Sequence, residues 1–139
     1  MNVYVDSSVL LRIVLGEPDG LHFWSRIEQP ISSELTRLEC LRTIDRARLQ
    51  FRLDEADIAR RRAAVLDTIE TFGIIPVTSS VLERAAEPFP TLIGSLDAIH
   101  LASALLVRQN ISTLAFATHD FELGRAARAV GFTVDGVEV

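Results

Sequence analysis

The stretch Val3-Tyr4-Val5-Asp6-Ser7-Ser8-Val9-Leu10 decides the fold of this chain. Its first three residues favour strands, and an acid with two serines separates them from the apolar pair that follows. An acid followed by apolar helix positions is typical of a helix start, so the stretch predicts a strand that turns directly into a helix. The carboxylate of Asp6 is therefore expected at the carboxyl end of a strand.

Similar junctions recur further along the chain. Asp97 opens the helix-like segment 98–106, and Asp120 follows the apolar run 114–118 just before another helical segment. Ligands bind at the carboxyl ends of strands in open α/β sheets, so we expect these acids to converge there. Converging carboxylates repel one another unless a cation lies between them, and ligation by oxygen alone suits Mg²⁺ or Mn²⁺ rather than Zn²⁺. The leading hypothesis is a metal-dependent site for phosphoryl transfer or phosphodiester cleavage.

The whole chain alternates short apolar runs with amphipathic segments. This alternation predicts an α/β fold with a central, mainly parallel β-sheet flanked by α-helices. Strands are expected at 2–5, 74–77 and 113–117, with a short terminal strand pair or tail at 132–139. Helices are expected at 7–15, 19–28, 33–52, 54–72, 79–87, 97–109 and 120–130. Because no linker or repeat separates these segments, residues 1–139 are expected to form a single domain.

Composition limits the classes of protein to consider. With 139 residues and 48% hydrophobic residues, the chain can bury one core. A single cysteine, Cys40, excludes an internal disulfide and agrees with a reducing compartment. No apolar run approaches the roughly 20 residues that span a bilayer, and no basic, then apolar, leader is seen. A cytoplasmic protein with no membrane contact is expected.

Charge is distributed unevenly along the chain. The net charge of −5 argues against a general nucleic-acid coat, which would be basic. All 14 basic residues are arginines, and seven of them lie between positions 42 and 62. That segment is either a surface that positions a phosphate backbone or a solvated helical hairpin with partly paired charges. The sequence leaves both readings open.

Each of Asp6, Asp97 and Asp120 taken alone also fits an ordinary helix cap. Glu39 discriminates between capping and a site, because it lies inside a long predicted helix where capping cannot explain an acid. Arg42, three residues later, either forms a weak surface pair with Glu39, holds it in place, or contacts a substrate phosphate. The four acids together therefore favour a site over four separate caps.

Several polar residues next to the acids are candidates for supporting roles. Ser7 and Ser8 follow Asp6 directly, and Thr118 precedes Asp120 by two residues, so their hydroxyls can bond to an acid or to a metal-bound water. Capping is an equally ordinary role for them. His100 lies on a largely apolar helix, which favours a hydrogen-bonded core residue over a catalyst, and Cys40 has no neighbours that would favour a thiolate.

Four segments resemble, in order and spacing, the motifs of PIN-domain ribonucleases, and most closely those of VapC-type toxins of toxin–antitoxin pairs. The most specific element is Leu96-Asp97-Ala98-Ile99-His100-Leu101-Ala102-Ser103-Ala104, and the likeness extends over nearly the whole chain. The other three segments are Val3-Tyr4-Val5-Asp6-Ser7-Ser8, Ser33-Glu34-Leu35-Thr36-Arg37-Leu38-Glu39 and Ala117-Thr118-His119-Asp120.

The resemblance implies a PIN-like fold in which Asp6, Glu39, Asp97 and Asp120 surround Mg²⁺ or Mn²⁺, with Thr118 at the supporting hydroxyl position. It also implies cleavage of an RNA substrate, a homodimer, and a cognate antitoxin whose tail fills the active-site groove. Two other α/β classes fit less well, because a phospho-accepting signalling domain needs a lysine and a haloacid-dehalogenase-like phosphatase needs a second acid where Ser8 stands. The alternative kept open is a catalytically silent PIN fold that acts as a binding or regulatory module.

Overall fold

β1 (Asn2–Val5) occupies the centre of a five-stranded sheet whose order is β3-β2-β1-β4-β5. The remaining strands are β2 (Gln29–Ser33), β3 (Gly73–Ile75), β4 (Ala115–Ala117) and β5 (Val134–Asp135). Every pairing between neighbouring strands is parallel, which confirms the predicted mainly parallel sheet. The computed structural model describes residues 1–16 and 24–139, and all structural statements below refer to that part of the chain.

Strand β2 corrects the prediction for the region between residues 19 and 33. Part of the helix predicted at 19–28 lies outside the described residues, and its described end contains only the 3₁₀ turn η1 (Trp24–Arg26). The sequence predicts that a helix ends before Pro30. In the structure Pro30 is the second residue of β2, close to the strand start where proline is tolerated. Ser32 compensates for its weak strand propensity by donating its hydroxyl to the carbonyl of Val5, at 2.6 Å.

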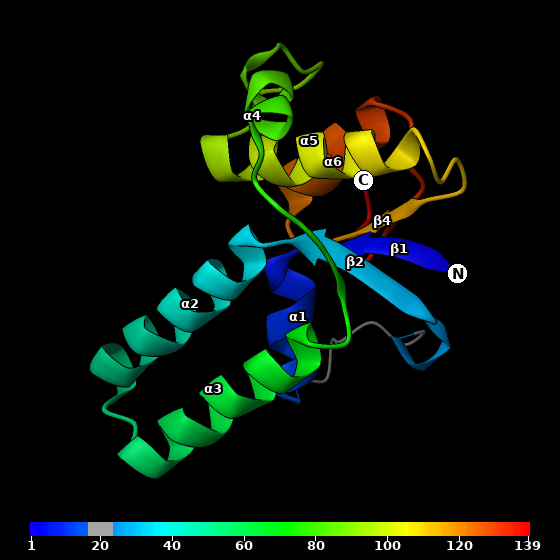
Figure 1. The fold of residues 1–139 in the computed structure, drawn as a ribbon. Helices are drawn as coiled ribbons and strands as arrows, with labels where there is room; N and C mark the ends of the chain where they lie inside the picture. The colour runs from blue at the N-terminus through cyan, green and yellow to red at the C-terminus, as the bar shows by residue number, and fades with distance from the viewer. Residues whose placement is uncertain (17–23) are drawn as a thin grey trace.

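The helices form one layer on each face of the sheet (Figure 1). In chain order they are α1 (Ser7–Val14), α2 (Leu35–Phe51), α3 (Glu55–Ile69), α4 (Ser79–Ala86), α5 (Ser95–Arg108) and α6 (Phe121–Ala129). α1, α2 and α3 cover one face, while α5 and α6 cover the other and α4 packs on α5. The fold is thus one α/β domain of three layers. No helix among the described residues is long and apolar enough to cross a membrane.

Alternating side chains of β1 reach both cores. Val3 and Val5 pack under α1 and α2, whereas Tyr4 points into the opposite core with α5 and α6. There the Tyr4 ring stacks on Phe116 of β4, with ring centroids 5.2 Å apart. Because the side chains of Val3, Tyr4 and Val5 are fully buried, the end of the strand is held firmly, and with it the position of Asp6.

The strand order creates a switch point between β1 and β4. The chain passes from β1 outward to β2 and β3, then returns to the other side of β1 to form β4 and β5. Loops that leave the carboxyl ends of two such strands diverge, and the crevice between them is where open α/β sheets bind ligands. Asp6 follows β1 and Asp120 follows β4, so two of the four acids lie at this crevice.

Helices α2 and α3 form a hairpin that extends away from the sheet in Figure 1. The break between the helices predicted at 33–52 and 54–72 is confirmed, since the Asp54 side chain caps α3 by accepting from the Asp57 backbone N–H at 2.8 Å. Arg52 ends α2 in the left-handed conformation at φ 50°. α3 ends at Ile69 rather than 72, because the chain must turn into β3 at Gly73.

Substitution of two glycines tests how tightly the C-terminal segment packs against the end of β4. At Gly136 (φ +98°) an added Cβ would lie 2.4 Å from the Thr118 carbonyl oxygen, whereas at Gly16 (φ +67°) no atom lies within 4 Å. We expect Gly136→Ala to lower the free energy of unfolding by more than about 2 kcal/mol and Gly16→Ala by about 1 kcal/mol, as measured by urea unfolding. Equal losses would show that the contact with Thr118 relaxes without cost.

Candidate functional site

Asp6 is buried at the N-terminus of α1, and protein groups hold both of its carboxylate oxygens. Ser8 Oγ donates to Oδ1 and Thr118 Oγ1 donates to Oδ2, each at 2.6 Å, while the Val9 backbone N–H donates to Oδ1 at 3.3 Å. Burial raises the pKa of Asp6, and His100 and the two hydroxyls act in the opposite direction. Asp6 is therefore both a helix cap and an oriented carboxylate, and the expected supporting roles of Ser8 and Thr118 are contacts with this residue.

The same hydroxyls connect Asp6 to the segment that carries Asp120. The backbone N–H of His119 donates to Ser8 Oγ at 2.9 Å, and that of Asp120 donates to Thr118 Oγ1 at 3.0 Å. Asp120 itself is exposed and caps α6 by accepting from the Leu123 backbone N–H at 2.8 Å. These bonds fix the start of α1 against the end of β4 across the switch point.

Asp97 lies in the first turn of α5 but does not cap it, because α5 begins at Ser95 with Gly94 at the N-cap. Burial is the main cause that raises the pKa of this half-buried carboxyl to about 6; the charges of Asp120, Asp6 and Glu39 act in the same direction and that of His100 in the opposite one. Capping therefore explains Asp6 and Asp120 but neither Asp97 nor Glu39. All four acids interact electrostatically around Asp97, although they come from four separate places in the chain.

Glu39 takes part in a hydrogen-bond chain that the sequence did not reveal. Its Oε1 accepts from Nε2 of His100 at 2.5 Å, and Nδ1 of His100 lies 2.8 Å from the Tyr4 hydroxyl. The prediction that His100 is a hydrogen-bonded core residue is confirmed, since it is 1% exposed. Its link to an acid 61 positions away could not be read from local pattern.

The expectation that Arg42 pairs with Glu39 or holds it in place is wrong, because Arg42 pairs with Asp45 instead. The guanidinium of Arg42 donates to Asp45 at 3.1 Å, in an exposed i, i+3 ion pair of the kind worth less than about 1 kcal/mol. Contact of Arg42 with a substrate phosphate remains a prediction. Cys40 meets its expectation, because burial, followed by the charges of Glu39 and Asp6, raises the pKa of its thiol to about 12.

The donor set fits a hard divalent cation. The four residues offer carboxylate oxygens only, and the pKa of Asp97 is raised first by burial and then by the neighbouring acids, whose repulsion a cation would relieve. Within residues 1–16 and 24–139, no group of three or more Asp, Glu, His or Cys side chains forms a ready-made metal cage. The chemistry of Asp6, Glu39, Asp97 and Asp120 therefore suits such a cation, and their role as its ligands stays a prediction.

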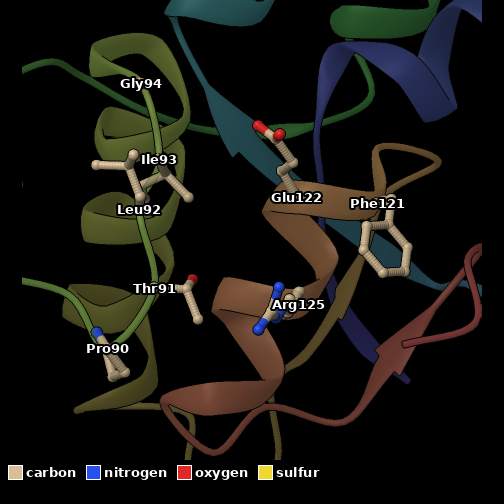
Figure 2. Close-up of a pocket in the computed structure, with 8 residues that line it drawn as sticks. All are labelled: Pro90, Thr91, Leu92, Ile93, Gly94, Phe121, Glu122 and Arg125. Carbon is tan, nitrogen blue, oxygen red and sulfur yellow. The ribbon is translucent and has the colours of Figure 1, made fainter.

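A surface pocket of about 710 Å³ lies between the loop before α5 and the side of α6, and the sequence does not predict it. Figure 2 shows its two walls, the loop from Pro90 to Gly94 and the side of α6 that carries Phe121, Glu122 and Arg125. Gly94 precedes Asp97 by three residues, and Phe121 follows Asp120 directly. The loop's Pro and Gly residues predicted an irregular segment, but only the packing of α5 beside α6 places it opposite Phe121.

The raised pKa of Asp97 leads to a pH prediction for the metal-free protein. The pKa of the Asp97 carboxyl is about 6 in the folded state and about 3.8 in the unfolded chain, so the folded state binds its proton more tightly. The contribution of Asp97 to the free energy of unfolding therefore falls as pH rises between these two values. The full shift corresponds to about 3 kcal/mol, and solvent screening at a half-buried group reduces the expected effect to about 1 kcal/mol.

Asp97→Asn should therefore gain about 1 kcal/mol relative to the wild type between pH 4 and pH 7, as measured by urea unfolding with chelator present. Asp67→Asn, on the exposed side of α3, is the matched control and should show no such pH-dependent gain. A constant difference between Asp97→Asn and the wild type across this range would contradict the electrostatic coupling of the acids.

Comparison with known proteins places this arrangement in a family. Residues 3–129 match the model of the PIN domain. The chain is 31% identical over 137 residues to Ribonuclease VapC47 of Mycobacterium tuberculosis (strain CDC 1551 / Oshkosh), which covers 94% of this chain and 93% of that protein.

Two solved structures share the fold. A toxin–antitoxin complex from Klebsiella pneumoniae superposes with a TM-score of 0.67 at 18% identity and covers all of both chains. VapBC2 from Rickettsia felis, bound to a DNA fragment from its promoter, superposes with a TM-score of 0.66 at 11% identity and covers 97% of this chain and 98% of that chain. The family match, the relative and the shared fold agree, and the chain belongs to the PIN-domain family, in its VapC group.

Proposed function

We propose that this protein is a metal-dependent endoribonuclease that hydrolyses RNA phosphodiester bonds and acts as the toxin of a toxin–antitoxin pair. The observation that carries the proposal is the position of Asp6 and Asp120 at the switch point of a PIN fold, together with the hydrogen bond that holds Glu39 against His100, one turn after Asp97 on α5. The likeness to Ribonuclease VapC47 over nearly the whole chain supports RNA as the substrate class. The likeness of the fold to toxin–antitoxin complexes supports the biological role.

In this proposal the four carboxylates hold Mg²⁺ or Mn²⁺. When bound, such an ion lowers the pKa of water and neutralises charge that develops on the phosphate oxygens. The chain's own contribution is orientation: Ser8 and Thr118 hold the two oxygens of Asp6, and the cap of α6 holds Asp120. Hydrolysis by water leaves a 5′-phosphate and a 3′-hydroxyl.

The described histidines favour this chemistry over attack by the 2′-hydroxyl, which needs His or Lys as a base. Both ring nitrogens of His100 are engaged, by Glu39 and Tyr4. Nδ1 of His119 donates to the Gly136 carbonyl at 2.8 Å, and its Nε2 is buried. The chain has no lysine.

The first prediction for this function concerns metal dependence. Cleavage of single-stranded RNA in Mg²⁺ or Mn²⁺ should stop with chelator, and Asp97→Asn should lower the rate by more than about a hundredfold, because even outer partners of metal ligands are worth 10–100-fold. Asp67→Asn, an identical change on α3, should cleave normally. An unchanged rate in chelator would overturn the metal mechanism, and no cleavage by the wild type would favour the silent binding module.

Partners and location belong to the proposal. A cognate antitoxin is supported by the toxin–antitoxin complexes that share the fold. A homodimer and action in the cytoplasm are proposed from the resemblance of the sequence alone. Exposed apolar side chains next to the site fit a covering partner, since Leu92 is 95% exposed and Phe121 is 55% exposed at the pocket. Such side chains next to a polar site are typical of binding surfaces.

The arginine-rich hairpin of α2 and α3 is the proposed contact for the RNA backbone. Three of the seven arginines between positions 42 and 62 are in ion pairs, Arg42 and Arg48 with Asp45 and Arg60 with Asp57. At 1.5 Å per residue, Arg52 lies about 20 Å along α2 from Glu39. The tip of the hairpin can therefore reach RNA several nucleotides from the scissile bond, whereas Arg42 lies only one helical turn from Glu39.

Replacing Arg46 and Arg48 by Ala tests this contact. The slope of the logarithm of RNA affinity against the logarithm of salt concentration reports the number of phosphate contacts. If each arginine contacts one phosphate, each loss should lower the magnitude of this slope by roughly 0.7 for a single strand. Arg128→Ala, on α6 beside the C-terminus, is a control for loss of charge alone and should leave the slope unchanged. An unchanged slope in the double variant would assign these arginines to the solvated surface.

A further inference from the structure

Glu39 differs from the other acids in how it is held. Asp6 and Asp120 accept hydrogen bonds from backbone N–H groups at the starts of α1 and α6. Glu39 is in the interior of α2, where backbone N–H groups are used within the helix, and its longer side chain has more rotamers to restrict. The hydrogen bond to His100 is the contact that restricts this side chain.

The imidazole of His100 is itself anchored. It is 1% exposed, Nδ1 is 2.8 Å from the Tyr4 hydroxyl, and the Tyr4 ring meets it edge-on at a centroid distance of 5.9 Å. A carboxylate only accepts hydrogen bonds, so Nε2 donates to Glu39 whichever partner donates between Tyr4 and Nδ1. The direction of support therefore runs from the buried core to the acid.

His100 also connects two layers of the fold. It lies one turn after Asp97 on α5, so one helix carries both a candidate ligand and the group that holds another. Glu39 comes from α2, which packs on the opposite face of the sheet. The His100–Glu39 bond thus spans the carboxyl edge of the sheet and sets the Glu39 carboxylate relative to Asp97.

We propose that His100, anchored by Tyr4, is a positioning residue that fixes the Glu39 carboxylate for binding of the divalent cation. The inference rests on the proposed function and adds a residue to it. Partners that orient metal ligands in this way are typically worth 10–100-fold in metal affinity. The competing reading is a buried polar pair that only contributes to packing, and the test must separate the two.

Two replacements of similar polarity form a matched pair. His100→Gln puts an amide nitrogen near the place of Nε2 and keeps a donor for Glu39, whereas the shorter His100→Asn reaches only the place of Nδ1. Mn²⁺ binding to each full-length protein, measured by calorimetry without RNA, should weaken 10–100-fold in His100→Asn and less than about threefold in His100→Gln. Equal weakening in both variants, or none in His100→Asn, would overturn the proposal.

A second readout needs no metal. Crystal structures of the metal-free variants should show Glu39 in its wild-type rotamer in His100→Gln and displaced in His100→Asn. An undisplaced Glu39 in His100→Asn would overturn the positioning role even if RNA cleavage is confirmed. Normal positioning in a wild type that neither binds Mn²⁺ nor cleaves RNA would instead overturn the proposed function and, with it, the purpose assigned to His100.

Tyr4→Phe keeps the test decisive if His100→Asn does not fold. The change removes the hydroxyl that anchors Nδ1 and keeps the ring that stacks on Phe116. We expect Mn²⁺ affinity to fall about threefold to tenfold with unchanged helix content by circular dichroism, a smaller effect than loss of the donor itself. Wild-type Mn²⁺ affinity in a folded Tyr4→Phe protein would contradict the anchoring of His100.

Discussion

The burial of the Asp6 carboxylate is the constraint on which the rest of the site depends. A buried carboxylate without donors is strongly destabilising, so hydroxyl and backbone donors must meet it. These donors come from both sides of the switch point, Ser8 and Val9 from α1 and Thr118 from the end of β4. The orientation of Asp6 therefore depends both on the start of α1 and on the pairing of β1 with β4.

The four acids destabilise the folded state, because the fold does not fully compensate for the burial of Asp97 and the repulsion between the carboxylates. The half-buried Asp97 has a raised pKa because burial and three neighbouring carboxylates disfavour its charge, and His100 only partly compensates. Local arrangements that lower stability are common where a site must bind a ligand, and here a divalent cation would turn the repulsion into affinity. The burial of Val3, Tyr4 and Val5 supplies the rigid base on which this arrangement can persist.

Local signals predicted much of the fold. The predicted bounds of β1, β4 and α5 agree with the structure within about two residues, and the predicted break between α2 and α3 is correct, because period and capping act over a few positions. Local pattern does not predict β2, because it contains Pro30 and two serines, which are weak strand formers. Its strand state depends on neighbours on both sides, β1 and β3, which lie far away in the sequence.

By itself the sequence determined the donor chemistry: four acids, three of them near helix starts and one inside a helix where capping could not explain it. Of the three, only Asp6 and Asp120 follow strands, since α5 with Asp97 comes after helix α4. The tertiary structure alone decided which atoms meet. The bond between Glu39 and His100, the support of Asp6 by Thr118 and the pocket beside Phe121 join segments 61 or more positions apart or depend on helix packing. Such contacts follow from the order of the strands and the packing of two helix layers, and no local periodicity encodes them.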